Sequence, residues 1–176
     1  METIELIKSK IREIPNWPKK GVSFKDITPL LQDKDIFRKM INLLATPYLG
    51  KRVDKIVGID ARGFILAAAL AYKLKAGLSI VRKKGKLPAK TVSKAYTLEY
   101  ASNTLEMHED TISPGEKILL VDDVLATGGT MKATIDLVKQ LKGKIAGVDF
   151  LIELSYLKGR KNLKGYKIRS LVKYEK

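Results

Sequence analysis

Apolar and polar residues alternate along this chain in blocks that predict strands and helices in turn. Short apolar runs at 55–60 (KIVGID), 77–83 (GLSIVRK) and 116–123 (EKILLVDD) are typical of buried strands. Residues 62–74 and 128–142 have the length and apolar spacing of helices. Strands that alternate with helices favour a parallel sheet covered by helices, so the expected fold class is α/β.

The first 49 residues predict helices separated by a loop. Residues 4–14 have helical periodicity, with Ile4, Ile7 and Ile11 on one face. Residues 15–29 (PNWPKKGVSFKDITP) are rich in Pro and Gly and predict a loop. Residues 33–49 begin with acids and predict a second helix.

Residues 83–103 are long, basic and weakly patterned. A connection of this length is unusual inside a compact domain and suggests a mobile or functional loop. A further strand is possible over 104–110, and strands are expected over 146–154 and 166–174.

Composition narrows the class of protein. A chain of 176 residues predicts one domain, and the absence of cysteine excludes disulfides and thiolate chemistry. No apolar run approaches the roughly 20 residues of a membrane span, and the charged N-terminus lacks the apolar region of a secretory signal. We therefore expect a cytoplasmic protein without a membrane partner. The formal charge of +15 suggests polyanionic partners, or alternatively a well-solvated lysine-rich surface.

The segment Ala126-Thr127-Gly128-Gly129-Thr130 follows a predicted strand and opens a predicted helix. Glycines allow close approach of the backbone, and successive N–H groups at a helix N-terminus favour an anion. The segment lacks the Gly-Lys-Ser/Thr of a Walker A loop, and the chain has no G-x-G-x-x-G motif. A phosphate loop of another kind is predicted, and an ordinary threonine-capped turn is the alternative.

Asp122 and Asp123 stand directly before this loop. Carboxylates repel phosphate but accept hydrogen bonds from a vicinal diol. A ribose 5-phosphate satisfies both features, with its phosphate in the loop and its hydroxyls on the two acids. A magnesium site and a pair of solvated acids are the alternatives.

At these residues the chain resembles the type I phosphoribosyltransferases. LLVDDVLATGGTM (119–131) is similar to their binding motif for phosphoribosyl pyrophosphate (PRPP), and its Asp-Asp pair is closest to the branch that uses adenine. Residues 14–31, 58–64, 82–100 and 151–163 resemble that branch's N-terminal segment, pyrophosphate loop, lid and C-terminal segment. The resemblance covers nearly the whole chain.

The resemblance implies a single domain, 1–176, with a central, mostly parallel sheet flanked by helices. It also implies a small N-terminal hood that binds the base (about 1–32) and a mobile lid (about 83–104). The implied reaction converts adenine and PRPP to AMP and pyrophosphate, with Mg²⁺ carried by PRPP, in a homodimer. The alternatives are a transferase for another 6-substituted purine and a PRPP-sensing regulator that binds nucleic acid. A nucleic-acid partner is not favoured, because the enzyme pattern already uses the whole chain.

The resemblance also implies roles for individual residues. The 5-phosphate is expected on Ala126, Thr127, Gly128, Gly129 and Thr130, and the ribose on Asp122 and Asp123. Pyrophosphate is expected on Asp60, Ala61, Arg62, Gly63, Arg82, Lys83 and Lys86, and adenine on Ser23, Phe24 and Lys25. Glu99 is expected to handle the purine proton, with Tyr100 beside it in the lid and Arg62 as a second catalytic residue. No direct protein ligand to the metal is implied.

Three residues depart from the family's usual pattern. Lys25 replaces an arginine, and it cannot reproduce a bidentate contact. Ala61 stands where some members have serine. Ala101 stands where glycine is usual, so that a left-handed turn there would be strained.

Overall fold

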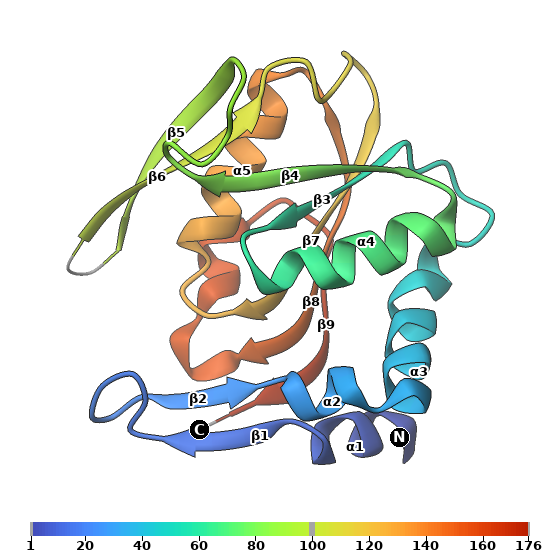
Figure 1. Ribbon diagram of the computed structural model, residues 1–176, viewed down its shortest axis with the longest axis vertical. Helices are drawn as coiled ribbons and strands as arrows, with labels where there is room; N and C mark the ends of the chain where they lie inside the picture. The colour runs from blue at the N-terminus through green and yellow to red at the C-terminus, as the bar shows by residue number, and fades with distance from the viewer. Residues whose placement is uncertain (1, 99–100, 176) are drawn as a thin grey trace. The chain divides into compact units, whose positions relative to one another are not determined.

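The computed structural model describes residues 2–98 and 101–175 and divides the chain into two compact units, 1–46 and 47–176. Within the described ranges, no helix is long and apolar enough to cross a membrane. Figure 1 labels the helices and strands of both units.

In its described residues the first unit contains three helices and a small antiparallel ribbon of two strands. Its elements are α1 (Glu2–Ser9), β1 (Arg12–Pro15), β2 (Ser23–Asp26), α2 (Thr28–Gln32) and α3 (Lys34–Ala45). Strands β1 and β2 pair from Arg12↔Asp26 to Pro15↔Ser23. The prediction of one helix over 4–14 was therefore wrong at its end, since α1 stops at Ser9 and Ile14 lies in β1. The predicted loop over 15–29 also contains a strand that sequence patterning missed.

The second unit is built on a seven-stranded sheet in the order β5-β6-β4-β3-β7-β8-β9. Its parallel strands are β3 (Lys55–Ile59), β4 (Gly77–Lys83), β7 (Lys117–Leu125), β8 (Lys144–Leu154) and β9 (Ile168–Tyr174). Strands β5 (Thr91–Leu98) and β6 (Ala101–His108) add an antiparallel hairpin at one edge. The sheet confirms the predicted α/β class, with a mostly parallel sheet.

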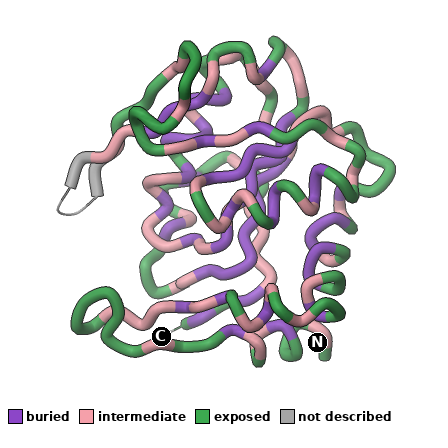
Figure 2. The backbone as a smooth tube through the Cα atoms, in the orientation of Figure 1, coloured by how far each residue is buried: buried purple, intermediate pink, exposed green. Residues whose placement is uncertain are grey.

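Helices α4 (Arg62–Leu74) and α5 (Gly129–Gln140) cover different faces of this sheet. Ile118 and Leu120 of β7 belong to the buried cluster that includes Ile135 of α5. Alternate strand residues point to opposite faces, so Leu119 and Val121 point toward α4, which packs on β3 and β7. The four β7 residues, 118–121, are all buried, and Figure 2 shows the buried strands at the centre of this unit. The short connections are 3₁₀ turns at Thr46–Tyr48, Ser155–Leu157 and Gly159–Leu163.

Residues 83–103 differ from the predicted loop. Most of them form the β5–β6 hairpin, whose pairing runs from Thr91↔His108 to Leu98↔Ala101. Hydrophobic patterning missed β5 because its side chains from Ser93 to Ala95 are exposed, so the ribbon carries no regular apolar face there. The possible strand over 104–110 is confirmed for residues 104–108, which belong to β6. The hairpin, rather than an irregular loop, occupies the region expected to be the lid.

A buried carboxyl joins strand β8 to the start of the second unit. The Tyr48 hydroxyl donates a hydrogen bond to Asp149 Oδ1 over 2.9 Å, and Arg169 Nη2 lies 3.7 Å from Oδ2. Burial raises the pKa of Asp149 to about 6, although Arg169 and the Tyr48 hydrogen bond oppose the increase.

This pKa predicts a pH-dependent stability. Unfolded Asp149 has a pKa near 3.8. Between pH 4 and 6 the folded protein therefore holds a proton that the unfolded protein has lost. The resulting stabilisation is complete below pH 4 and is lost as the pH rises through 6. Asp149→Asn abolishes the titration and keeps an oxygen acceptor for Tyr48. The free energy of unfolding of the variant should therefore rise relative to wild type by up to about 3 kcal/mol from pH 4 to pH 7.

Urea unfolding at both pH values measures this difference. Asparagine carries no charge at either pH, so the contribution of residue 149 to the stability of the variant does not change across this range. A difference that stays flat with pH would contradict the shifted pKa.

Candidate active site

Three strand ends bring the predicted site residues of the second unit to one edge of the sheet. Strand β3 pairs in parallel with β4 at Ile59↔Val81 and with β7 at Gly58↔Val121. Asp60, Arg82 and Asp122 follow these positions and therefore lie near one another at this edge. The Asp60 amide donates to the Val81 carbonyl over 3.0 Å, which fixes the start of the first loop. Ligands of open parallel sheets bind at this carboxyl edge.

The loop at 126–130 has the geometry that its glycines predict. Gly128 has φ 84°, lies at the N-cap of α5 and provides no side-chain cap for the helix. The first N–H groups of α5 are therefore available to an anion, and the helix dipole favours negative charge there. A cavity of about 130 Å³ borders the loop, and its lining includes Asp122, Ala126, Thr127, Gly128 and Thr130.

Residues 159–162 support this loop from behind. The Asn162 side-chain amide donates to the Thr127 carbonyl over 2.8 Å. A Cβ atom on Gly128 would lie 2.5 Å from the Gly159 carbonyl oxygen, and one on Gly159 would lie 2.2 Å from the Ala126 carbonyl oxygen. Both positions therefore require glycine. Sequence reasoning did not single out Gly159 or Asn162; only the family resemblance of residues 151–163 pointed to this segment.

The acid pair lies at the end of β7, where the loop begins. Asp122 Oδ1 accepts a hydrogen bond from the Asp123 amide over 2.9 Å. Burial and the neighbouring Asp123 carboxylate raise the pKa of Asp122 well above its ordinary value. Burial also raises the pKa of Asp123, while the Arg62 guanidinium opposes that rise. Hydrogen-bond donors or a positive charge would therefore stabilise both carboxyls in their charged form.

Helix α4 meets the acid pair at its first turn. Arg62 Nε lies 2.8 Å from Asp123 Oδ2, and a Cβ atom on Gly63 would lie only 2.8 Å from Asp122 Oδ1. Glycine at 63 therefore lets the helix approach the acids. The N-cap residue of α4, Ala61, makes no side-chain hydrogen bond to the helix, and the Asp60–Ala61 peptide is cis. The structure thus brings together Arg62, which was predicted on pyrophosphate, and Asp123, which was predicted on ribose.

Strand β4 contributes a second arginine. Arg82 Nε donates to Asp60 Oδ2 over 2.9 Å, and its Nη1 donates to the Lys86 carbonyl over 3.2 Å. The side chains of Lys83 and Lys86 are exposed. Among the described contacts, Asp60 and Arg82 form an ion pair, and neither Lys83 nor Lys86 forms one with Asp60.

The predicted adenine residues lie in β2 of the first unit. The Lys25 ammonium is buried, donates to Glu13 and donates to Ser23 Oγ over 3.0 Å. The Lys25 hydrogen bond lowers the pKa of Glu13. The ring of Phe24 packs edge-on against Trp17, with centroids 4.4 Å apart. Because its ammonium is engaged inside the ribbon, Lys25 is suited to contact a base through its backbone.

Glu99 and Tyr100, predicted in the lid, lie outside the described residues. In the described part of the hairpin, Lys94 of β5 lies 3.4 Å from Asp136 of α5, which also pairs with Lys132. These contacts connect the hairpin to the helix that follows the phosphate loop.

Comparisons with known proteins show the family to which the chain belongs. The phosphoribosyl transferase domain family matches residues 27–171. The chain belongs to the phosphoribosyltransferase family. It is 54% identical to the adenine phosphoribosyltransferase of Trichlorobacter lovleyi over 97% of this chain and 100% of that protein.

Solved structures share the fold of these phosphoribosyltransferases. A crystal structure of adenine phosphoribosyltransferase from Thermoanaerobacter pseudethanolicus matches with a TM-score of 0.94 and 50% identity, over 97% of this chain and 99% of that one. The Saccharomyces cerevisiae enzyme, complexed with D-2,5-dideoxy-2,5-imino-altritol 1,6-bisphosphate and adenine, matches with a TM-score of 0.91 and 33% identity, over 97% and 98% of the two chains. The fold is therefore that of the type I phosphoribosyltransferases.

The contact behind the phosphate loop generates a prediction. Gly159→Ala should displace the Ala126 carbonyl and raise the KM for PRPP by roughly tenfold or more, because a displaced loop loses hydrogen bonds to phosphate. Steady-state kinetics with varied PRPP measure this effect.

Gly165→Ala is the matched control. Gly165 has φ 88° and no atom within 4 Å of the added Cβ, so alanine there strains the backbone without touching the loop. It should lower the unfolding temperature and leave the KM for PRPP unchanged. Equal KM values for wild type and Gly159→Ala would show that Gly159 does not position the loop.

Proposed function

We propose that this protein is an adenine phosphoribosyltransferase, which converts adenine and PRPP to AMP and pyrophosphate in purine salvage. The observation that carries the proposal is the uncapped start of α5 after the 126–130 loop, which follows the Asp122–Asp123 pair near the end of β7, at the edge where parallel-sheet proteins bind ligands. The assignment of adenine is supported by the 54% identity to the T. lovleyi enzyme along the whole chain and by adenine in the related yeast structure.

The 5-phosphate of PRPP is assigned to the backbone N–H groups and hydroxyls of the 126–130 loop. The ribose 2- and 3-hydroxyls are assigned to Asp122 and Asp123. Hydroxyl donors suit these two carboxyls, because carboxylate oxygens accept hydrogen bonds and burial weakens their solvation by water. One ligand then has its anionic end on helix amides and its diol end on acids.

The pyrophosphate is assigned to residues 60–63 and to Arg82, Lys83 and Lys86. Helix α4 begins without a side-chain cap, and a guanidinium fork suits phosphate oxygens. Arg62 has to exchange its contact with Asp123 for one with the diphosphate, which leaves Asp123 open to the ribose. Mg²⁺ is assigned to the PRPP complex as part of the substrate, and no cluster of three metal-ligating side chains was found in the described part of the chain.

The chemistry is a displacement at the anomeric carbon through a state with oxocarbenium character. Positive side chains stabilise the leaving pyrophosphate, and N9 of adenine attacks the opposite face of the ribose ring. The protein's contribution is position and preorganised charge. Glu99 is assigned to the purine proton, and Tyr100 and the rest of the lid (about 83–104) are assigned to excluding water, which competes as a nucleophile.

Adenine is assigned to Ser23, Phe24 and Lys25, within the N-terminal base-binding segment (about 1–32) of a single phosphoribosyltransferase domain, 1–176. Phe24 offers an aromatic face that Trp17 holds in place. The backbone at Lys25 supplies polar groups for the base edge, since the Lys25 ammonium binds Glu13 and Ser23.

A homodimer in the cytoplasm is the proposed working form. Ile65 and Tyr72 of α4 and Leu78 of β4 are large apolar side chains that are exposed, and Tyr72 is 90% exposed. Ile65 and Tyr72 are seven residues apart and therefore share one face of the helix. A second copy that covers this face would remove their apolar surface from water.

A purine-by-purine assay tests the proposed reaction. With PRPP and Mg²⁺, adenine should give AMP and pyrophosphate, while hypoxanthine and guanine should give little product. The site discriminates by hydrogen bonds to the base edge, and loss of such bonds costs about 1–3 kcal/mol each. High-performance chromatography of the nucleotide products measures the outcome.

Preference for guanine or hypoxanthine would overturn the assignment of adenine and leave the family unchanged. Absence of turnover with every purine, together with DNA binding that persists at high salt, would instead favour the PRPP-sensing regulator.

A further inference from the structure

A basic cavity lies at the edge of the sheet opposite the candidate active site. Its volume is about 510 Å³, within the range of small-molecule sites, and all its lining residues belong to the second unit. The residues that define this basic cavity are Tyr48, Lys51, Arg52, Lys117, Lys144 and Lys167.

The basic cavity is remote from the reaction assigned above. Lys117 is the first residue of β7, and Leu125, beside the phosphate loop, is its last. A strand of this length spans roughly 25 Å at about 3.3 Å per residue. Lys144 likewise begins β8, and Lys167 directly precedes β9. The proposed function therefore uses none of these residues.

The charges that line the cavity have one sign. Five of its side chains are cationic, and no carboxylate lines it. Within 2–98 and 101–175, none of the four lysines forms an ion pair closer than 4.0 Å. Like charges gathered at one concave surface repel one another, and an anion relieves that repulsion.

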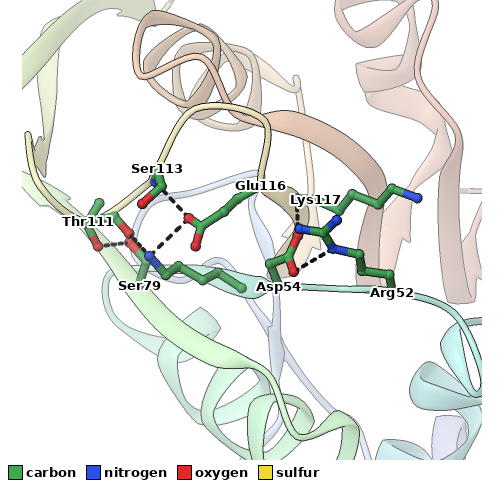
Figure 3. Close-up of polar contacts among 8 residues, drawn as sticks. Arg52, Asp54, Ser79, Thr111, Ser113, Glu116 and Lys117 are labelled. Atoms are coloured by element: carbon green, nitrogen blue, oxygen red, sulfur yellow. Dashed lines mark hydrogen bonds and ion pairs between the residues drawn. The ribbon is translucent and has the colours of Figure 1, made fainter.

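Arg52 differs from the lysines because a carboxylate positions it. Its Nε donates to Asp54 Oδ1 over 2.8 Å, and Asp54 Oδ2 accepts from the Lys117 amide over 2.7 Å. Figure 3 shows these contacts and the Lys117 side chain extending away from the Arg52–Asp54 pair. Asp54 thus fixes Arg52 beside the start of β7 and leaves the Lys117 ammonium outside the pair.

The floor of the cavity is fixed by packing. The Tyr48 hydroxyl binds Asp149, and a Cβ atom on Gly147 would lie 2.1 Å from that hydroxyl oxygen. The Arg169 guanidinium lies 5.8 Å from the centre of the Tyr48 ring. Val53 and Ile145 add apolar surface to the lining. A rigid floor surrounded by exposed cationic side chains is better suited to a small ligand than to a large, flat macromolecule.

We propose that the basic cavity binds a small polyphosphate anion, at a site separate from that of PRPP. Lysine ammonium groups are point charges without a preferred planar geometry, so they suit a chain of phosphates rather than a single carboxylate. Several charge-assisted hydrogen bonds can form at once, since five cations border the same cavity. Binding is expected to weaken with ionic strength, because the lysine side chains are exposed.

Lysine acetylation followed by mass spectrometry tests this site locally, without reference to catalysis. Inorganic tripolyphosphate is titrated into the intact protein, and the acetylation rates of Lys144 and Lys167 are recorded. Both rates should fall in a saturable way, while those of Lys39 and Lys139, exposed on α3 and α5, should not change. In Lys117→Gln the midpoint concentration should rise roughly tenfold, because the variant loses one charge-assisted contact to the anion.

Lys139→Gln is the matched control, since it removes the same charge from an exposed helical position and should leave the midpoint unchanged. AMP formation should stay normal in Lys117→Gln. The proposal therefore fails or stands independently of the proposed transferase activity.

A parallel titration with ATP identifies the source of the phosphates. Tighter binding of ATP than of tripolyphosphate indicates a nucleotide that also uses the apolar lining, and equal or weaker binding indicates inorganic polyphosphate. Unprotected Lys144 and Lys167, equal protection of Lys39 and Lys139, or an unshifted midpoint in Lys117→Gln would each overturn the proposal. Protection by a short DNA duplex but not by tripolyphosphate would also overturn it and would assign the surface to nucleic acid.

Discussion

The site depends on a backbone constraint: two helices begin at the same edge of a parallel sheet without side-chain caps. Helix α4 starts after Ala61 and α5 after Gly128, and neither N-cap residue binds the free N–H groups of its helix. In contrast, Asp33 caps α3 by accepting from two amides. An uncapped helix start leaves donors for a ligand, and the parallel register of β3 and β7 places both starts at one edge. The phosphoribosyl assignment follows from this arrangement.

The acid pair gives the same edge its chemical selectivity. Helix amides alone would bind any anion. Asp122 and Asp123 repel an anion unless the same molecule carries hydrogen-bond donors, such as hydroxyls, close to its charge. Burial raises the pKa of both carboxyls, and Arg62 partly compensates the charge of Asp123. In the proposed complex, hydroxyl donors of a sugar phosphate replace this compensation and free the guanidinium for a second anionic group. The Arg62–Asp123 contact therefore links the proposed ribose and pyrophosphate subsites.

Sequence patterning predicted the parts of the chain that are buried on regular faces. Residues 55–59, 62–74 and 77–83 were recovered closely because buried strands and an apolar helix leave strong periodic signals. Strand β5 was missed because its exposed residues carry no such signal, and β2 was hidden by flanking Pro and Gly. The turn at Gly128 that opens α5 agrees with the glycines of 126–130, and the role of this loop in binding phosphate stays a prediction. The support from Gly159 and Asn162 could not be predicted, because it depends on tertiary contacts across more than 30 residues of sequence.

A crystal structure of the protein soaked with AMP tests the central assignment most directly. The account predicts that the phosphate accepts hydrogen bonds from main-chain amides within 126–130, at about 2.7–3.2 Å between heavy atoms. It also predicts that the ribose hydroxyls lie at hydrogen-bond distance from Asp122 and Asp123, with the Arg62 guanidinium displaced from Asp123. AMP bound elsewhere, with this loop empty and the Arg62–Asp123 contact intact, would contradict the account.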